Sequence, residues 1–416
     1  MKSNYKPIGD FIRLVDIRNK ELKNLELVGV TVNKRFIPSV ANIIGSDMTN
    51  YKIIKKNQFA CSLMQVRRDG KIPVALFDEG EAIISQAYPV FEIVDTNELL
   101  PQYLMMWMTR SEFDREACFY AVGGVRGSLE WEDFCAMQLP VPSIEKQKEI
   151  IKEYHTITDR IKLNEQLNQK LEDTAQSIYK EWFVNFEFPD ENGKPYKSNG
   201  GEMVYCEELD MEIPKGWKLS IIANEIDYKK GFAFKSDNYV ENGVGIVRVS
   251  NFTYNSIDVS DCNYISKLYA HNYEQYNLET NDIIISTVGS WPNNPDSIVG
   301  KVVNVPISAN NYLLNQNTVR LRMKNFQLQK YLYFHIKNKK YSDYILSGAQ
   351  GSANQASVTL EHLFSYPILK LTDNVVENFF NIFNKLSTQQ NILNSENTKL
   401  ESLKKVLLSK MATIEE

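Results

Sequence analysis

The sequence predicts an α+β protein with two mixed α/β domains, each followed by a long helix, and with the two helices pairing as an antiparallel coiled coil with pseudo-two-fold symmetry. Three observations predict this fold. Short words recur about 229 residues apart, two heptad seams occupy equivalent places in the repeat, and β-rich runs fill the segments before them. A repeat this long is a whole domain plus a helix, since solenoid units recur about every 20–50 residues.

The duplicated words keep the same order in both halves of the chain. NQKLE at residues 168–172 returns as NTKLE at residues 397–401. ISQ (84–86), QYL (102–104) and GS (127–128) return as LNQ (314–316), KYL (330–332) and GS (351–352). We therefore expect one architecture in both halves.

Residues 144–186 and 373–416 carry apolar side chains at alternating steps of three and four, the heptad pattern of a coiled coil. Asn168 and Asn397 occupy the same step, and a polar seam residue fixes register and partner at a cost in stability. An amphipathic helix packed only on its own domain is the alternative, but globular helices usually run about 8–20 residues. The predicted pairing seam consists of Ile157, Ile161, Asn168, Leu171, Ile178, Leu386, Leu393, Asn397, Leu400 and Leu407.

Changes in composition set the domain boundaries. PVPS at residues 140–143 ends the first domain and offers Ser143 as the start of the long helix. Residues rich in Pro, Gly, Asn and acid predict a linker before PKGW at residues 214–217. The predicted segments are a first domain (1–143), a central helix (144–186), a linker (187–213), a second domain (214–372) and a C-terminal helix (373–416).

Composition excludes several classes of protein. A chain of 416 residues with 43% hydrophobic content has material for two or three domains with cores and is not disordered. The first residues lack an apolar signal region, and no run approaches the roughly 18 apolar residues of a membrane span, so we expect a cytoplasmic protein. The five cysteines are scattered without a CxxC pair, which indicates reduced structural thiols.

Motifs of catalysis are missing from the sequence. It contains no GxxxxGK[ST] phosphate loop, no GxGxxG after a strand and no HExxH, and its four histidines are not spaced as ligands. We therefore predict no catalytic residue, no metal site and no bound cofactor. A net charge of −5 at first argues against DNA binding, but acidic residues concentrate in residues 144–211, which leaves the domains free to present basic faces.

The doubled layout resembles the specificity subunits of type I restriction-modification systems over essentially the whole chain. The words that carry the resemblance are AIISQAYPVF (82–91), LPVPSIEKQKEI (139–150), IYKEWF (178–183) and PKGW (214–217). The second copy departs from the pattern at residues 369–372, where LKLT replaces the Pro-x-Pro boundary and blurs the start of the second helix.

The resemblance implies that each domain is a target recognition domain that reads one half of a split double-stranded DNA site. The helices would space the domains and bind two methylation subunits, and restriction subunits would join the complex. Methylation with S-adenosylmethionine, and cleavage with ATP and Mg, would belong to those partners. This chain would bind none of these cofactors and would not be an enzyme by itself.

Candidate DNA contacts follow from side-chain chemistry, since Arg forks onto guanine, Asn and Gln pair with adenine, and Arg and Lys bind phosphate. The candidates are Arg67, Arg68, Arg126, Asn251, Asn293, Asn294, Lys339, Lys340, Gln350, Asn354 and Gln355. Gln86 and Gln316 recur in both halves. Because readers of two different half-sites should differ, we assign this duplicated pair to structure.

A helix of about 40 residues rises roughly 60 Å. If the second helix returns antiparallel, which a long linker could prevent, the half-sites are inverted and lie within about 18 base pairs of each other. The half-sites should differ because the two domains differ in sequence. The alternative is a coiled-coil scaffold that bridges protein partners, which the acidic helices favour. Two divergent domains beside two similar helices argue against that alternative. The target bases and the length of the gap stay open.

Overall fold

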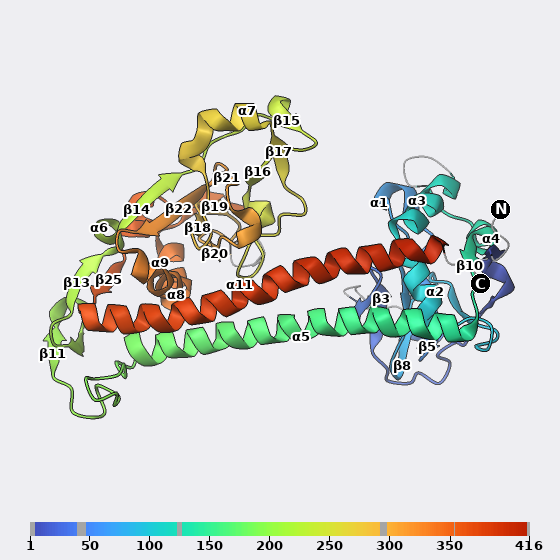
Figure 1. The fold of residues 1–416 in the computed structure, drawn as a ribbon, viewed down its shortest axis with the longest axis horizontal. Helices are drawn as coiled ribbons and strands as arrows, with labels where there is room; N and C mark the ends of the chain where they lie inside the picture. Colours follow the sequence, from blue (N-terminus) through green and yellow to red (C-terminus); the bar gives the residue numbers. More distant parts are fainter. Residues whose placement is uncertain (1–4, 40–46, 123–126, 292–297, 353, 414–416) are drawn as a thin grey trace. The chain divides into compact units, whose positions relative to one another are not determined.

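The computed structural model describes residues 5–39, 47–122, 127–291, 298–352 and 354–413 (Figure 1). The chain divides into two compact units. Unit 1 is Met1–Glu165 with Asn394–Glu416, and unit 2 is Gln166–Leu393. Each long helix therefore contributes one part to unit 1 and the other part to unit 2.

The described residues of unit 1 form three sheets. The first is the antiparallel pair β1–β10, and the second is an antiparallel sheet in the order β2-β9-β6-β7. The third has the order β4-β3-β8-β5, with β3 parallel to β8. The strands are β1 (Tyr5–Pro7), β2 (Ile12–Leu14), β3 (Leu27–Val30), β4 (Phe36–Pro38), β5 (Lys52–Lys55), β6 (Gln58–Cys61), β7 (Val74–Leu76), β8 (Glu81–Ile84), β9 (Val90–Ile93) and β10 (Gln138–Pro140).

Helices cover the β2-β9-β6-β7 sheet of unit 1. They are α1 (Val66–Asp69), α2 (Pro101–Met108), α3 (Ser111–Tyr120) and α4 (Trp131–Ala136), together with parts of α5 (Ile144–Phe183) and α11 (Asp373–Lys410). Pro101 suits the first position of α2, where its missing N–H costs nothing. Phe59 of β6 stacks on Phe91 of β9 with ring centroids 4.9 Å apart, and Phe134 of α4 packs on Phe91. These rings form the centre of the first core.

Unit 2 repeats the central sheet and the parallel strand pair of unit 1, differs at the edges of the outer sheet, and adds two pieces. Its sheets have the orders β14-β22-β18-β20, β15-β17-β16-β21 and β13-β25, and the additions are the hairpin β11-β12 and the sheet β19-β24-β23. The strands are β11 (Met203–Cys206), β12 (Met211–Pro214), β13 (Lys218–Ile221), β14 (Ile226–Lys230), β15 (Tyr239–Val240), β16 (Val244–Val247), β17 (Asn263–Ile265), β18 (Ile283–Ser286), β19 (Val288–Gly289), β20 (Val302–Asn304), β21 (Leu313–Leu314), β22 (Thr318–Met323), β23 (Gln350–Ser352), β24 (Gln355–Ser357) and β25 (Pro367–Lys370).

The core of unit 2 is aromatic. Phe183 of α5 lies 4.8 Å from Phe379 of α11 and 4.7 Å from Tyr331, measured between ring centroids. In Figure 1, α8 and α9 lie between the β14-β22-β18-β20 sheet and α11. The helices of unit 2, besides its parts of α5 and α11, are α6 (Ile222–Glu225), α7 (Lys267–Ala270), α8 (Gln329–Lys337), α9 (Lys339–Gly348) and α10 (Leu360–Phe364).

The duplicated sequence words occupy equivalent places in the two units. Tyr103 of α2 donates its hydroxyl hydrogen to Pro140 O of β10 at 3.2 Å, and Tyr331 of α8 donates to Leu369 O of β25 at 3.1 Å. The β3–β8 pair of unit 1 and the β16–β21 pair of unit 2 are both parallel. The expectation of one shared architecture is confirmed for the central four-stranded sheets, which share strand order and register, and for these parallel pairs; the outer sheets differ at their edge strands.

The two long helices contact each other inside each unit. In unit 1, Ile150 shares a core with Leu408 and Met411, while Asn164 Nδ2 donates to Asn397 Oδ1 at 2.8 Å. In unit 2, Trp182 and Phe379 have ring centroids 6.0 Å apart. The residue that bonds Asn397 is thus Asn164, one helical turn before the Asn168 that the repeat pairs with it.

The predicted seam residues face inward to different degrees. Ile157, Ile161 and Leu393 are buried, and the remaining seven are half-buried: Asn168, Leu171, Ile178, Leu386, Asn397, Leu400 and Leu407. Five apolar residues of α5 and α11 off this seam are exposed: Leu163, Leu167, Ile392, Leu403 and Val406. Others off the seam, including Tyr179, Val376 and Leu408, are buried. Burial therefore follows the predicted seam only in part.

The observed boundaries differ from the predicted ones in three places. Helix α11 ends at Lys410 rather than residue 416. Helix α5 ends at Phe183 rather than residue 186, because Phe186 adopts a left-handed conformation (φ 62°) and its ring packs on Trp217. The segment predicted as a linker contains β11 and the start of β12. Ser143 Oγ accepts from Lys146 N at 3.3 Å, as expected at the start of α5.

The five cysteines all lie in the described part of the chain and are free thiols. No helix among the described residues is long and apolar enough to cross a membrane.

Candidate nucleic-acid interface

In unit 2, two loops meet beyond the end of β18. Strand β19 follows β18 directly and pairs with β24, which in turn pairs with β23. Trp291, which follows β19, donates its indole N–H to Ser352 O of β23 at 2.8 Å. The β23-β24 hairpin is therefore attached to the loop that leaves the central sheet at β18.

Unit 1 brings the corresponding two segments together after β6. Arg67 N in α1 donates to Gly127 O at 3.3 Å, and Val122 forms a bridge with Ser128. Gly127 has φ +38°, and a Cβ there would lie 2.5 Å from Arg67 Cβ, so only glycine permits this approach. The repeated Gly-Ser word thus marks the same junction in both units.

Five of the candidate residues lie exposed at these junctions. Arg67 and Arg68 are on α1 of unit 1, where Arg68 Nε pairs with Asp69 Oδ1 at 2.7 Å. Gln350, Asn354 and Gln355 are on or beside the β23-β24 hairpin of unit 2, and all three are exposed. Within each unit these side chains can reach one ligand surface. Arg126, Asn293 and Asn294 lie outside the described residues.

Asn251 is a correction to the sequence-based set. It is only 3% exposed, its Oδ1 accepts from Arg248 N at 2.9 Å, and its Nδ2 donates to Asp261 O at 3.1 Å. Both edges of the amide that would pair with adenine are therefore used inside the domain. Asn251 caps a short helical turn (Val249–Asn251), and we assign it to the fold.

Lys339 and Lys340 lie away from the β23-β24 hairpin, at the start of α9. The Lys339 side chain is 85% exposed and pairs with Asp343 at 2.8 Å, one helical turn along. Both lysines line a cavity of about 300 Å³ together with Glu172 and Gln176 of α5. The structure thus places this pair beside the long helix, and not with the other candidate contacts of unit 2.

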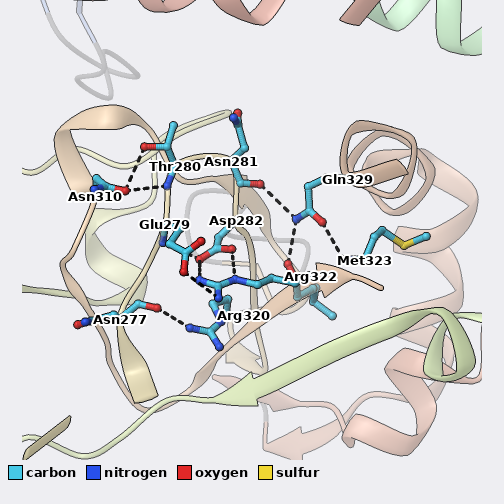
Figure 2. A network of polar contacts seen from close by, with 11 residues as sticks. Asn277, Glu279, Thr280, Asn281, Asp282, Asn310, Arg320, Arg322, Met323 and Gln329 are labelled. Atoms are coloured by element: carbon cyan, nitrogen blue, oxygen red, sulfur yellow. Dashed lines mark hydrogen bonds and ion pairs between the residues drawn. The ribbon is translucent and has the colours of Figure 1, made fainter. Parts of the chain in front are cut away.

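Arg322, on a β-strand with Arg320, shows how a cationic pair in the sequence is neutralised in the fold. Arg322 Nε and Nη2 bond the two Asp282 carboxylate oxygens at 2.5 and 2.8 Å, and Nη1 lies 3.0 Å from Glu279 (Figure 2). The hydrogen bonds that Arg322 donates to Asp282 raise the pKa of Arg322, whereas burial lowers the pKa of Arg320. Arg320 donates to Asn277 O.

The same place in unit 1 carries the opposite charge. Glu92 of β9 accepts from Arg13 of β2 at 2.7 Å and from Gln58 of β6 at 2.9 Å. Arg322 and Glu92 are each the last residue but one of their strands. Arg322 lies opposite Asp227, as Glu92 lies opposite Arg13. Equivalent positions of the two units therefore carry a polar contact in which the charge of the central residue is inverted.

Sequence reasoning missed one residue that joins the two loops of unit 2. The sequence around Trp291 is typical of a surface loop. Only the hydrogen bond from Trp291 to Ser352 O shows that this residue joins the loop after β19 to the β23-β24 hairpin. The recurrence of the Gly-Ser word was the available signal. Among the described residues, no group of three His, Cys, Asp or Glu side chains is arranged to hold a metal ion.

Comparisons with known proteins agree with the duplicated α+β architecture. The family model described as "Type I restriction modification DNA specificity domain" matches residues 12–173 and again residues 214–403. The chain therefore belongs to the family of type I restriction-modification DNA specificity domains. The two matches correspond to the two halves of the repeat.

Individual relatives carry related names. The chain is 26% identical over 245 residues to the MjaIX specificity subunit of Methanocaldococcus jannaschii, covering 58% of this chain and 52% of that relative. It is 26% identical over 162 residues to the HindI specificity subunit of Haemophilus influenzae, covering 38% of this chain and 35% of that relative. The chain thus aligns with about half or less of the length of these relatives.

A solved structure shares the fold. The S subunit of a type I restriction-modification system from M. genitalium matches with a TM-score of 0.51 at 14% identity, covering 99% of this chain and 96% of that one.

Proposed function

We propose that this chain is the DNA specificity subunit of a type I restriction-modification system. It recognises a bipartite, asymmetric double-stranded DNA site, one half with each unit, and it docks methylation and restriction subunits. The chain itself contributes no catalytic residue and binds no cofactor. S-adenosylmethionine, ATP and Mg serve the partner subunits.

The observation that carries this proposal is the contrast between a shared scaffold and divergent loops. Both units share the strand order of the central sheet, the Tyr103 and Tyr331 hydrogen bonds and the Gly-Ser junctions. The side chains displayed at the junctions differ, with arginines in unit 1 and amides in unit 2. Arginine favours guanine and carboxamides favour adenine, so the halves of the site should differ in sequence.

We further propose that α5 and α11 pair as an antiparallel coiled coil with pseudo-two-fold symmetry. Contacts within unit 1 support the direction, since the early α5 residue Ile150 meets the late residue Leu408, while Arg160 pairs with the earlier Glu396 at 2.9 Å. Under this symmetry the two half-sites are inverted. Replacing Leu171 and Leu400 with Asp should break this pairing and reduce co-purification of the methylation subunit.

Mapping of methyladenine tests the proposal. The chain is expressed with the methylation subunit encoded beside it in a host that lacks adenine methylation, and the genome is mapped at single-base resolution. A split, asymmetric motif is the expected result. A folded complex that co-purifies but methylates no motif would contradict the proposal and favour a scaffold that bridges protein partners.

A further inference from the structure

Gln86 and Gln316 occupy the same structural position in the two units. Ile84 and Leu314, two residues earlier, close the parallel strand pairs with Val28 and Val247. The strands that follow, β9 and β22, pair with β2 and β14 in the same register. The offset of 230 residues therefore holds on both sides of the turn. The two turns have the same length, so Gln86 and Gln316 are structurally equivalent.

The glutamine is the one identity in this part of the repeat. Between residues 81–93 and residues 311–323, aligned at that offset, every other position differs. Ser85 becomes Asn315 and Ala87 becomes Asn317 on either side of it. A side chain kept where all its neighbours have changed points to a common requirement of the two units.

That requirement is not internal to the fold. Both side chains are exposed, and neither makes a hydrogen bond to another described residue. The main chain holds the turns instead: Tyr88 N donates to Ser85 O at 3.1 Å, and Gln316 N donates to Phe232 O at 2.9 Å. A carboxamide with a structural role would be buried or bonded, as Asn251 is. The structure therefore overturns our assignment of this duplicated pair to structure.

Both turns touch the end of the central strand from which the candidate DNA-contacting loops begin. In unit 1, Cys61 N at the end of β6 donates to Pro89 O at 3.1 Å. In unit 2, Thr287 N beyond β18 donates to Asn317 O at 2.8 Å. Each glutamine thus sits beside the loop that leads to Arg67 or to Trp291.

The surroundings of both glutamines suit an anion. Neither turn, residues 85–89 or residues 315–317, contains an acidic residue. Lys52 Nζ donates to Tyr88 O at 2.8 Å, which holds a cation beside the first turn. Lys230 is exposed and precedes by two residues the Phe232 carbonyl that bonds Gln316 N. Ser85 and Ala87 also line an open cavity of about 290 Å³ next to Gln86.

We propose that Gln86 and Gln316 each donate a side-chain N–H hydrogen bond to the phosphodiester backbone of DNA, at equivalent positions in the two half-sites. This inference rests on the proposed function. Two half-sites that differ in their bases share the backbone, so a contact kept in both units fits the backbone and not a base edge. The glutamines set the position of each unit on the duplex, while the divergent loops read the sequence.

Binding measurements on the complex of the full chain with its methylation subunits test the inference. Gln86→Ala and Gln316→Ala should each weaken binding about tenfold, because each loses a hydrogen bond to a charged group. The loss should be equal on a duplex that carries the mapped motif and on a duplex of the same length without it. Gln86→Lys and Gln316→Lys should restore affinity and steepen the salt dependence by about one phosphate contact.

A matched control is Gln275→Ala, which removes an exposed glutamine of unit 2 that has no counterpart in unit 1 and should leave binding unchanged. Thermal unfolding equal to that of the wild type verifies the fold of each variant. Ala variants that bind like the wild type would overturn the inference. So would a change of one base in the methylated motif, which would make the glutamine a base reader. If the wild-type complex itself binds no DNA, the proposed function fails as well.

Discussion

Replacing Lys34 with Met is expected to destabilise unit 1 by about 3–5 kcal/mol, because it leaves a buried carboxylate without its counter-charge. Lys34 Nζ donates to Asp114 Oδ1 at 2.7 Å and to Met108 O at 2.6 Å. The two side chains are only 6% and 10% exposed. The same Asp114 oxygen accepts from Ile72 N at 3.1 Å, so one carboxylate joins three separate segments of the first domain.

The magnitude follows from what the substitution leaves behind. Met fills nearly the space of the lysine stem, so the packing of that stem is retained and the loss is chiefly electrostatic. Burial lowers the pKa of Lys34, which means that desolvation opposes the charge and Asp114 offsets it. Adding Asp114→Asn to Lys34→Met removes both charges and keeps an oxygen for Ile72 N. This double variant should lose only about 1–2 kcal/mol, since Met108 O alone loses its donor.

Two measurements on the full chain check this reasoning. Denaturant unfolding gives the free energies of both single variants and of the double variant, and the expected coupling between the two positions is at least about 2 kcal/mol. Hydrogen exchange of the Ile72 amide reports the site itself and should accelerate in Lys34→Met. A single-variant cost below about 1 kcal/mol, or additive single-variant costs, would refute the account of a buried and mutually dependent pair.

Three further predictions concern the helices and the two units. Burial lowers the pKa of His335 to about 4, so between that value and the unfolded value near 6.5 the unfolded chain binds more protons. The stability of unit 2 should be complete above about pH 6.5 and fall by up to about 3 kcal/mol as the pH drops to 4, and His335→Gln should flatten this profile in thermal unfolding. Asn164→Ala should cost unit 1 about 1–2 kcal/mol by denaturant unfolding, because Asn397 loses its hydrogen-bond donor. Replacing both Asn164 and Asn397 with Leu should recover that loss. Equal stability of wild type and Asn164→Ala would contradict a stabilising contact between the helices. Exchanging residues 1–143 for another recognition domain should change one half of the methylated motif and leave the other half intact, and a change in both halves would show that the units do not read independently.

The sequence by itself determined the duplication, the fold class and part of the buried face of the long helices. These features depend on short periods and on recurring words. The heptad steps through Ile157 and Ile161 identify a buried face without knowledge of its partner, because the helix itself places those residues on one side. The ISQ and LNQ words likewise return at the same strand ends, since local strand patterning fixes the register.

Only the tertiary structure decided which polar side chains remain available to a ligand. Asn251 has the right chemistry for adenine, but its carboxamide already forms hydrogen bonds with the main chain of Arg248 and Asp261. Arg322 has the right charge for phosphate, yet Asp282, which is 40 residues away in the sequence, neutralises it. Gln86, which we assigned to structure from the repeat, is exposed and its side chain bonds no other residue of the described ranges.

The physical reason is the range of the interactions involved. Periodicity and strand register arise between residues close in the chain, so composition and spacing carry them. A hydrogen-bond partner is chosen by packing across the domain, as when contact between the two long helices brings Asn164 to Asn397. The spacing of residues within one helix does not show which residue of another segment a polar side chain will bond. The free energy of a buried polar group depends on that partner.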